Sequence, residues 1–377
     1  MKHTVLCGID RESDLRALVN GKKTALLTAA SGVNKKGVST YRVLSEISDL
    51  RFLFAPEHGI SSTMQDGGFS KEDGVLHPET GAKLYDISAL RGTDKLAELL
   101  REVDIAIYDI QDVGARFYTY ICNLTQLMRA AKTAGKPVLV LDRPNPIGNA
   151  LCEGLILDES RFSSFVGEFA VPTRYALTVG EYARYVNAEK GIGCDLTVLA
   201  CHGWEPHLYY DETDLLWVNP SPNIPTVNSA INYIGSCIYE ASNLSEGRGT
   251  TRPFDWLGAP FVDEEALVKD MNALSLPGVV FRPMTFTPMF NKHEKQICRG
   301  AELHITDRDA YRPFETMLHM FRHFKKYPEF EMKRPGLALR LGQDILTEDY
   351  DPVAILAKCD EDIKGFCEKV EKYRMYF

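Results

Sequence analysis

The sequence predicts an α/β protein with a Rossmann-like parallel-sheet subdomain at the N-terminus and a smaller α+β subdomain after it. Two observations support this fold class. Short apolar runs alternate with segments of helical spacing in the first half of the chain, which is typical of a parallel sheet covered by helices. The 377 residues also exceed what one hydrophobic core usually serves. We expect the N-terminal subdomain to span residues 1–227 and the second subdomain residues 228–377.

Four apolar runs in the first subdomain are each short and each followed by a polar loop, which predicts buried parallel strands. They are Thr24–Ala29, Leu50–Ala55, Ile105–Ile110 and Pro137–Leu141. Helical spacing predicts helices at Lys95–Val103, Thr119–Thr133 and Val179–Glu189.

The second half of the chain does not show this regular alternation of strands and helices. Three prolines within residues 219–225 predict a rigid loop, and we place the subdomain boundary just after it. Small and polar residues dominate residues 240–254, which predicts a long polar loop. Further on we expect strands at Gly278–Phe281 and Glu302–Ile305 and helices at Pro313–Lys326 and Asp360–Tyr373.

Composition narrows the class of protein. The formal net charge of −9 disfavours nucleic acid as a partner, and no segment approaches the ~20 apolar residues of a membrane helix. The N-terminus lacks a signal segment, which predicts a cytoplasmic protein; a chain trimmed of such a segment would instead be exported. Nine scattered cysteines without a Cys-x-x-Cys pair are typical of reduced thiols.

Polar side chains follow each predicted strand, and the carboxyl ends of parallel strands meet at one edge of a sheet, where ligands bind. After the second strand comes Glu57, with Pro56 fixing the backbone before it and Gly59 permitting a sharp turn. Glu57 could donate a proton to a leaving group if burial raises its pKa, or it could cap a helix or pair with an arginine. We expect His58 to hold Glu57 in place.

The loops after the third and fourth strands carry further candidates, each with a structural alternative. Asp109 or Asp112 could be a second catalytic carboxylate, or could form an ion pair with Arg116 that shapes the loop. Arg143, with Asn145 beside it, could bind a substrate carboxylate or could join two loops.

Two other candidates lie elsewhere. Tyr118 could offer a stacking face to a sugar, or could belong to the core. Glu246 and Arg248 lie in the polar loop, where Gly247 and Gly249 let the backbone approach a ligand closely. This loop is long and polar, so we favour a functional role over a structural turn.

Several familiar motifs are absent from the sequence. It contains no Gly-x-x-x-x-Gly-Lys-Ser/Thr loop, no Gly-x-Gly-x-x-Gly after a strand and no Gly-x-Ser-x-Gly elbow. His319 and His323 have the i, i+4 spacing of metal ligands but no accompanying carboxylate, which is more typical of ordinary histidines on an amphipathic helix.

Several segments, in this order, resemble the bacterial exo-β-N-acetylmuramidases. The matching stretches are FAPEHG (54–59), YDIQDVGARFYTY (108–120), LDRPNPIG (141–148), CEG (152–154), PSPNIPT (220–226) and NLSEGRGTTRPF with GAP (243–260). The resemblance implies an exo-acting glycosidase that removes terminal β-N-acetylmuramic acid, or a related amino sugar, from peptidoglycan fragments. It also implies a Rossmann-like catalytic subdomain at residues 1–227, with the active site in the cleft between it and the second subdomain. The substrate implied is a small carbohydrate, and neither a metal nor another cofactor is expected.

The resemblance makes Glu57 the leading catalytic residue. Glycoside cleavage usually needs a second carboxyl group, for which Asp109, Asp112 and Glu246 are the candidates. The lactyl carboxylate of muramic acid calls for an arginine, and the candidates are Arg116, Arg143, Arg174 and Arg248. Glu153 and Asn223, in two of the matching segments, are assigned to substrate binding.

The chain departs from the family pattern in three places, at residues 29–32, 60–64 and 175–176. These departures leave two alternatives to a glycosidase. One is a non-catalytic protein that binds cell-wall fragments. The other is a metal-dependent hydrolase that would use His58, Asp109 and Asp112.

Overall fold

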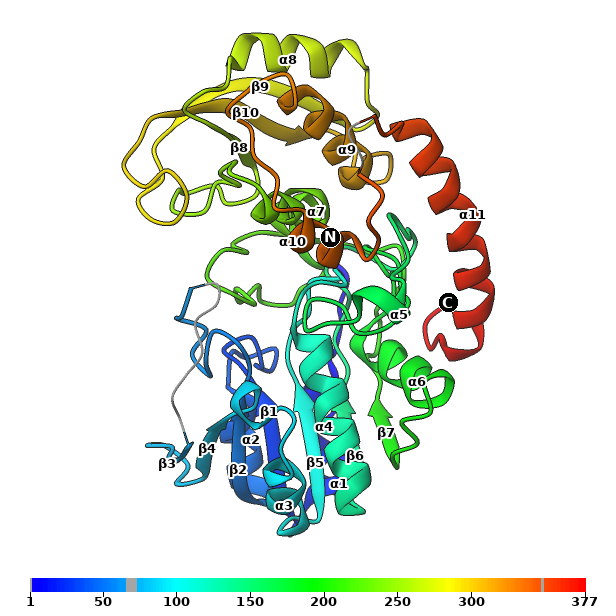
Figure 1. Cartoon of the computed structure of the whole chain (residues 1–377). Coiled ribbons are helices and arrows are strands. Elements are labelled where there is room, and N and C mark those ends of the chain that lie inside the picture. Colours follow the sequence, from blue (N-terminus) through cyan, green and yellow to red (C-terminus); the bar gives the residue numbers. More distant parts are fainter. Residues whose placement is uncertain (1, 66–72, 347–348) are drawn as a thin grey trace.

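The computed structural model describes residues 2–65, 73–346 and 349–377 and confirms the predicted α/β fold. Figure 1 shows two lobes, one built on strands β1 to β7 and the other on strands β8 to β10. One hydrophobic cluster extends through both lobes. None of the helices in the described part of the chain has the length and apolar character needed to cross a membrane.

The first lobe contains a seven-stranded sheet of order β3-β4-β2-β1-β5-β6-β7, in which only β3 runs antiparallel to its neighbour. The four predicted strands are confirmed as its centre, β2-β1-β5-β6. The short strands β3 and β4 at one side of the sheet and β7 at the other were missing from the prediction. The bounds are β1 Lys23–Thr28, β2 Asp49–Ala55, β3 Asp73–Leu76, β4 Lys83–Asp86, β5 Ile105–Asp109, β6 Val138–Leu141 and β7 Leu196–Leu199.

Helices pack around this sheet, and the three predicted ones are confirmed within two residues at each end. Gly135 ends α4 in a left-handed conformation (φ +68°), which glycine adopts without strain. Thr178 and Glu181 form a capping box at the start of α6. The bounds are α1 Glu12–Val19, α2 Thr40–Ile47, α3 Lys95–Arg101, α4 Tyr120–Ala134, α5 Glu159–Phe162 and α6 Val179–Glu189.

The second lobe is a three-stranded antiparallel sheet of order β8-β10-β9 with helices packed beside it. Both predicted strands are present, but they extend further than the sequence indicated, since they form a long paired ribbon. The bounds are α7 Val227–Ser236, β8 Trp256–Ala259, α8 Glu264–Ala273, β9 Val279–Phe286, β10 Cys298–Ile305, α9 Pro313–Phe324 and α10 Arg334–Leu341.

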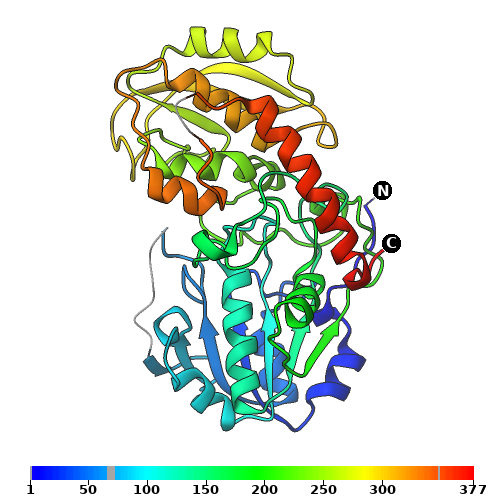
Figure 2. The ribbon, with the colours of Figure 1, turned by 45° about the vertical axis from the view of Figure 1, so that its right-hand side comes forward.

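The last long helix, α11 (Pro352–Val370), runs from the second lobe down to the first (Figure 2). It begins earlier than predicted because Asp351 caps it, accepting a hydrogen bond from the Val353 N–H at 3.1 Å. Beyond it, the Tyr376 hydroxyl donates to Asp142 at 2.6 Å. The end of the chain therefore packs against the first lobe, although it follows the second lobe in sequence.

Two helical glycines provide a matched test of this packing. A Cβ atom at Gly235, in α7, would lie 2.2 Å from the Pro313 carbonyl oxygen at the contact with α9, whereas a Cβ at Gly365, in α11, would meet nothing within 4 Å. We expect Gly235→Ala to lower the free energy of unfolding by about 1–3 kcal/mol through overpacking. Gly365→Ala should raise it by about 0.5–1 kcal/mol, because alanine favours helix. Denaturant unfolding of both variants measures the difference, and equal effects would contradict the close α7–α9 contact.

Candidate active site

A buried ion pair joins the loops at the carboxyl edge of the large sheet. The Arg143 guanidinium donates to both oxygens of Asp109, at 2.5 and 2.9 Å, and to the Val33 carbonyl oxygen at 2.8 Å. Thr40 donates to the same Asp109 carboxylate. The loops after β1, β5 and β6 therefore converge as the strand pattern predicted. Asp109 and Arg143 are almost completely buried and occupied by each other, which favours the structural alternative for both.

Glu57 lies next to this edge, directly after β2, in a cavity of about 110 Å³ between the two lobes. The residue is only 7% exposed, and its carboxylate accepts a hydrogen bond from the Thr119 hydroxyl at 2.9 Å. Glu57 is thus a buried carboxylate with a fixed orientation that faces a cavity. The cavity is lined by Glu57, His58, Phe117, Tyr118, Thr119, Phe165, Val166, Ser221, Asn223, Tyr233, Cys237, Glu240, Arg248, Phe254 and Arg340.

The backbone turns sharply after Glu57. His58 has a φ of +75°, which is uncommon for a residue with a side chain and costs conformational energy. The His58 Nδ1 atom lies 2.8 Å from the Met64 carbonyl oxygen, to which it donates. This bond ties the turn to the following loop, which agrees with the supporting role expected for His58.

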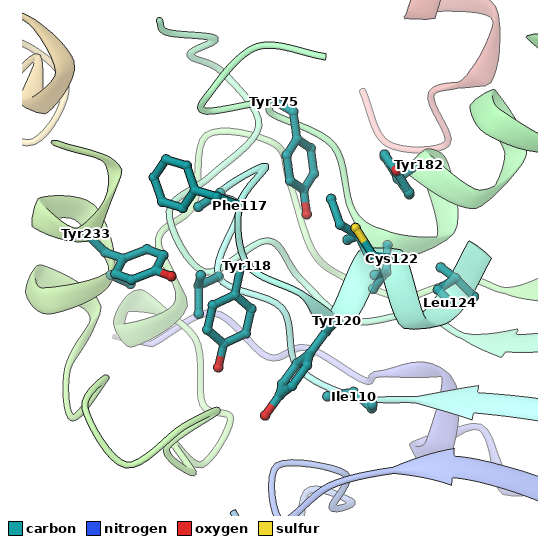
Figure 3. Packing of buried hydrophobic residues seen from close by; sticks show 14 of the residues in the cluster. Ile110, Phe117, Tyr118, Tyr120, Cys122, Leu124, Tyr175, Tyr182 and Tyr233 are labelled. Carbon is teal, nitrogen blue, oxygen red and sulfur yellow. The ribbon is translucent and has the colours of Figure 1, made fainter. Parts of the chain in front are cut away.

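Aromatic rings form one wall of the cavity. Tyr118 lies between Tyr120 and Tyr233 (Figure 3), with ring centroids 4.7 and 5.8 Å away and edge-to-face geometry. Tyr233 packs in turn on Phe254 at 4.7 Å. The rings hold one another rigidly, so they offer a preformed apolar surface of the kind that sugar rings contact.

A cluster of buried charges from the second lobe forms another wall. Glu240 lies between Arg248 and Arg340 and forms ion pairs with both. Burial alone raises the pKa of Glu240, but the two arginines outweigh it and lower the pKa to about 2. Glu240 therefore stays ionised at neutral pH. It cannot donate a proton there, and it holds both guanidinium groups at the cavity.

Glu246 contacts this cluster from outside the cavity. It accepts from Arg248 at 2.6 Å and from the Lys292 ammonium at 2.9 Å, and it does not line the cavity. This arrangement favours a positioning role for Glu246 over the role of second catalytic carboxylate.

Asp112 and Asn145 lie in the loops beneath the cavity and do not line it. Asp112 accepts hydrogen bonds from the Tyr175 hydroxyl and from the Gly114 N–H at 2.6 Å, and burial raises its pKa to about 7. Asn145 donates to the Leu177 carbonyl oxygen at 3.1 Å. Both side chains therefore stabilise loop conformations. One departure from the family pattern, at residues 175–176, lies in the segment before α6 and contacts this loop, because Tyr175 is the hydrogen-bond donor to Asp112.

Arg116, Glu153 and Arg174 connect segments of the chain and also lie outside the cavity. Arg116 donates to two carbonyl oxygens at 2.8 Å, those of Val171 and Arg340. Glu153 accepts from the Phe314 N–H at 2.7 Å, at the start of α9, and Arg174 donates to the Ile147 carbonyl oxygen. Arg116 and Glu153 each link the first lobe to the second. They contribute to the cavity only by fixing its walls.

Five of the predicted site residues line the cavity, namely Glu57, His58, Tyr118, Asn223 and Arg248. Sequence reasoning missed Thr119, Tyr233, Glu240 and Arg340. The first of these lies inside a matching segment, next to Tyr118, and could have been found there. No sequence pattern marks Arg340 as a site residue, because it reaches the cavity only through the packing of α10 against residues 237–241.

The alternative of a metal-dependent hydrolase receives no support from this geometry. Asp109 is occupied by Arg143, and His58 donates to a backbone oxygen. Across residues 2–65, 73–346 and 349–377, no group of three or more His, Cys, Asp or Glu side chains is placed to hold a metal ion.

The fold and the site together define a class of protein. A buried carboxylate, a rigid aromatic wall and a pair of arginines around one interlobe cavity are typical of a hydrolase that acts on an anionic sugar. The chain belongs to the exo-beta-N-acetylmuramidase NamZ family. The N-terminal model of this family matches residues 24–228 and the C-terminal model matches residues 231–376. The predicted family and the prediction of a glycoside hydrolase are thereby confirmed.

Individual relatives agree with this assignment. The chain is 42% identical over 387 aligned positions to the peptidoglycan beta-N-acetylmuramidase NamZ of Bacillus subtilis, covering 100% of this chain and 92% of the relative. Two crystal structures of DUF1343 family proteins from Bacteroides fragilis have the same fold. One has a TM-score of 0.90 at 30% identity over 100% of both chains, and the other a TM-score of 0.79 at 25% identity over 99% of both.

The raised pKa of Asp112 predicts a pH-dependent stability difference. The folded protein retains the Asp112 proton up to a pH of about 7, whereas the unfolded chain releases it near the ordinary value of 3.8. The free energy of unfolding of the wild type should therefore fall between these pH values relative to Asp112→Asn, by about 1.4 kcal/mol per pH unit at most. Urea unfolding of both proteins from pH 4 to pH 7 measures this. A difference that stays constant would show that Asp112 is ionised in the fold.

Proposed function

We propose that this protein removes terminal β-linked N-acetylmuramic acid from small peptidoglycan fragments such as muropeptides. The observation that carries the proposal is the lining of one cavity by Glu57 and by the Arg248–Arg340 pair. Muramic acid differs from glucosamine by a lactyl carboxylate, and arginine is the side chain best suited to bind such a group. The name of the Bacillus subtilis relative supports the same substrate.

The description of the matching family as exo-beta-N-acetylmuramidases supports exo action. Cleavage would therefore release one terminal residue at a time.

Glu57 is assigned as the proton donor. Its protonated carboxyl group gives a proton to the glycosidic oxygen, which leaves with the remainder of the chain. The hydroxyl group of a water molecule becomes bonded to the anomeric carbon, and the remaining proton of that water restores the Glu57 carboxyl group. Thr119 keeps the carboxyl group oriented. Glu240 cannot take this role, because it stays ionised between its two arginines. Its part is to orient Arg248 and Arg340 toward the lactyl carboxylate.

Replacement of Glu57 tests the assignment directly. We expect Glu57→Gln to lower kcat by about 10²–10⁴-fold on N-acetylmuramic acid β-linked to N-acetylglucosamine, because a sugar hydroxyl leaves only with the proton that the amide cannot donate. The loss on para-nitrophenyl β-N-acetylmuramide should be smaller, because the acidic nitrophenol leaves with less help from a proton. Glu361→Gln, on the exposed part of α11, is the matched control and should retain full activity. Retention of wild-type kcat by Glu57→Gln would contradict the assignment.

The substrate is tested by comparing two sugars on the same enzyme. Wild type should hydrolyse the muramide and leave para-nitrophenyl β-N-acetylglucosaminide nearly untouched, since the second lacks the carboxylate. Equal turnover of both, or of the glucosaminide alone, would show that the arginines do not select muramic acid.

A further inference from the structure

A second and larger cavity lies beside the Glu57 cavity, with a volume of about 500 Å³. It forms a groove between α3, one face of α4 and the loop of residues 163–168. We call it the α4 groove. Its lining consists of Leu90, Arg91, Gly92, Thr93, Asp94, Leu96, Ala97, Cys122, Gln126, Arg129, Ala130, Thr133, Ser163, Ser164, Phe165 and Glu168. Nothing in the mechanism above uses it.

The α4 groove lies next to the Glu57 cavity. Phe165 lines both of them, so the two spaces share this side chain. Thr119, which donates to Glu57, directly precedes the first residue of α4. From there the groove follows α4 from Cys122 to Thr133, about 16 Å at 1.5 Å per residue. A chain whose end lies at Glu57 therefore has a path along the surface of α4.

One arginine in this groove is placed to bind an anion. The Arg91 guanidinium lies 3.6 Å from the centre of the Phe165 ring, which the two spaces share. Within the described part of the chain, no carboxylate forms an ion pair with Arg91, whereas Arg129 is paired with Glu168. Burial lowers the pKa of Arg91, while the charges of Glu168 and Glu57 act in the opposite direction.

We infer that the α4 groove binds the leaving part of the substrate, an amino-sugar chain that carries carboxylates. Phe165 contacts the sugar next to the cleaved bond, and the Arg91 guanidinium binds a carboxylate on the residue that follows. In peptidoglycan, muramic acid residues alternate with glucosamine residues, so a released muramic acid is followed by a neutral sugar and then by an anionic one. The inference rests on the proposed function, and it adds a specificity site for chain length.

The test compares substrates with and without the anionic leaving part. Arg91→Gln should lower kcat/KM on a tetrasaccharide of alternating muramic acid and glucosamine by about tenfold, the effect of losing one charge-assisted contact. Its kcat/KM on para-nitrophenyl β-N-acetylmuramide should stay within about twofold, because that leaving group has no carboxylate. Arg91→Lys should recover part of the loss. Arg101→Gln, at the exposed end of α3, is the matched control and should change neither value.

Two outcomes would overturn the inference. An equal loss on both substrates would mean that Arg91 acts on Glu57 and not on the leaving chain. No loss on either would mean that the groove is not used.

A binding measurement separates this inference from the proposed function. Calorimetry with the disaccharide glucosamine–muramic acid, both N-acetylated, needs no turnover. Tighter binding to wild type than to Arg91→Gln would support the groove even if neither protein hydrolysed a muramide. Equal binding to both, in a protein that hydrolyses muramides normally, would reject the groove and leave the proposed function intact.

Discussion

The buried pair of Asp109 and Arg143 is the interaction on which the rest of the site depends. It joins the ends of β5 and β6, and through Val33 and Thr40 it also joins the loop after β1 and the start of α2. Removing one partner from such a pair leaves an uncompensated charge, which costs roughly 3–5 kcal/mol. The pair therefore fixes the loops at the carboxyl edge of the sheet. Glu57 lies next to this rigid edge.

The second lobe completes the cavity, because its charged side chains line it together with the Glu57 carboxylate of the first lobe. Glu240 fixes two arginines, and the Arg340 backbone is itself held by Arg116 from the first lobe. Neither lobe contains the whole site. Only a few side chains contact the substrate. A larger set of buried polar groups holds those side chains in position through hydrogen bonds.

The sequence predicted the centre of the large sheet well, because its apolar runs and intervening helical periods are strong local signals. It missed the strands β3, β4, β7 and β8 and the helices α7, α8 and α10, which are short or depend on packing. The proline and glycine around Glu57 drew attention to it, and the family resemblance made it the leading candidate. The roles of Asp109 and Arg143 were not, because ion pairing between distant residues is decided by the fold. Glu240 and Arg340 were missed for the same reason, since they lie 100 positions apart.

The most direct test of the central claim is a crystal structure of Glu57→Gln with a bound disaccharide of N-acetylmuramic acid β-linked to N-acetylglucosamine. The account predicts the glycosidic oxygen within about 2.6–3.2 Å of the residue 57 side chain. It also predicts the lactyl carboxylate beside Arg248 and Arg340 and the glucosamine ring against Phe165. A muramic acid bound at Asp109 or Asp112, with residue 57 out of reach of the glycosidic bond, would contradict it.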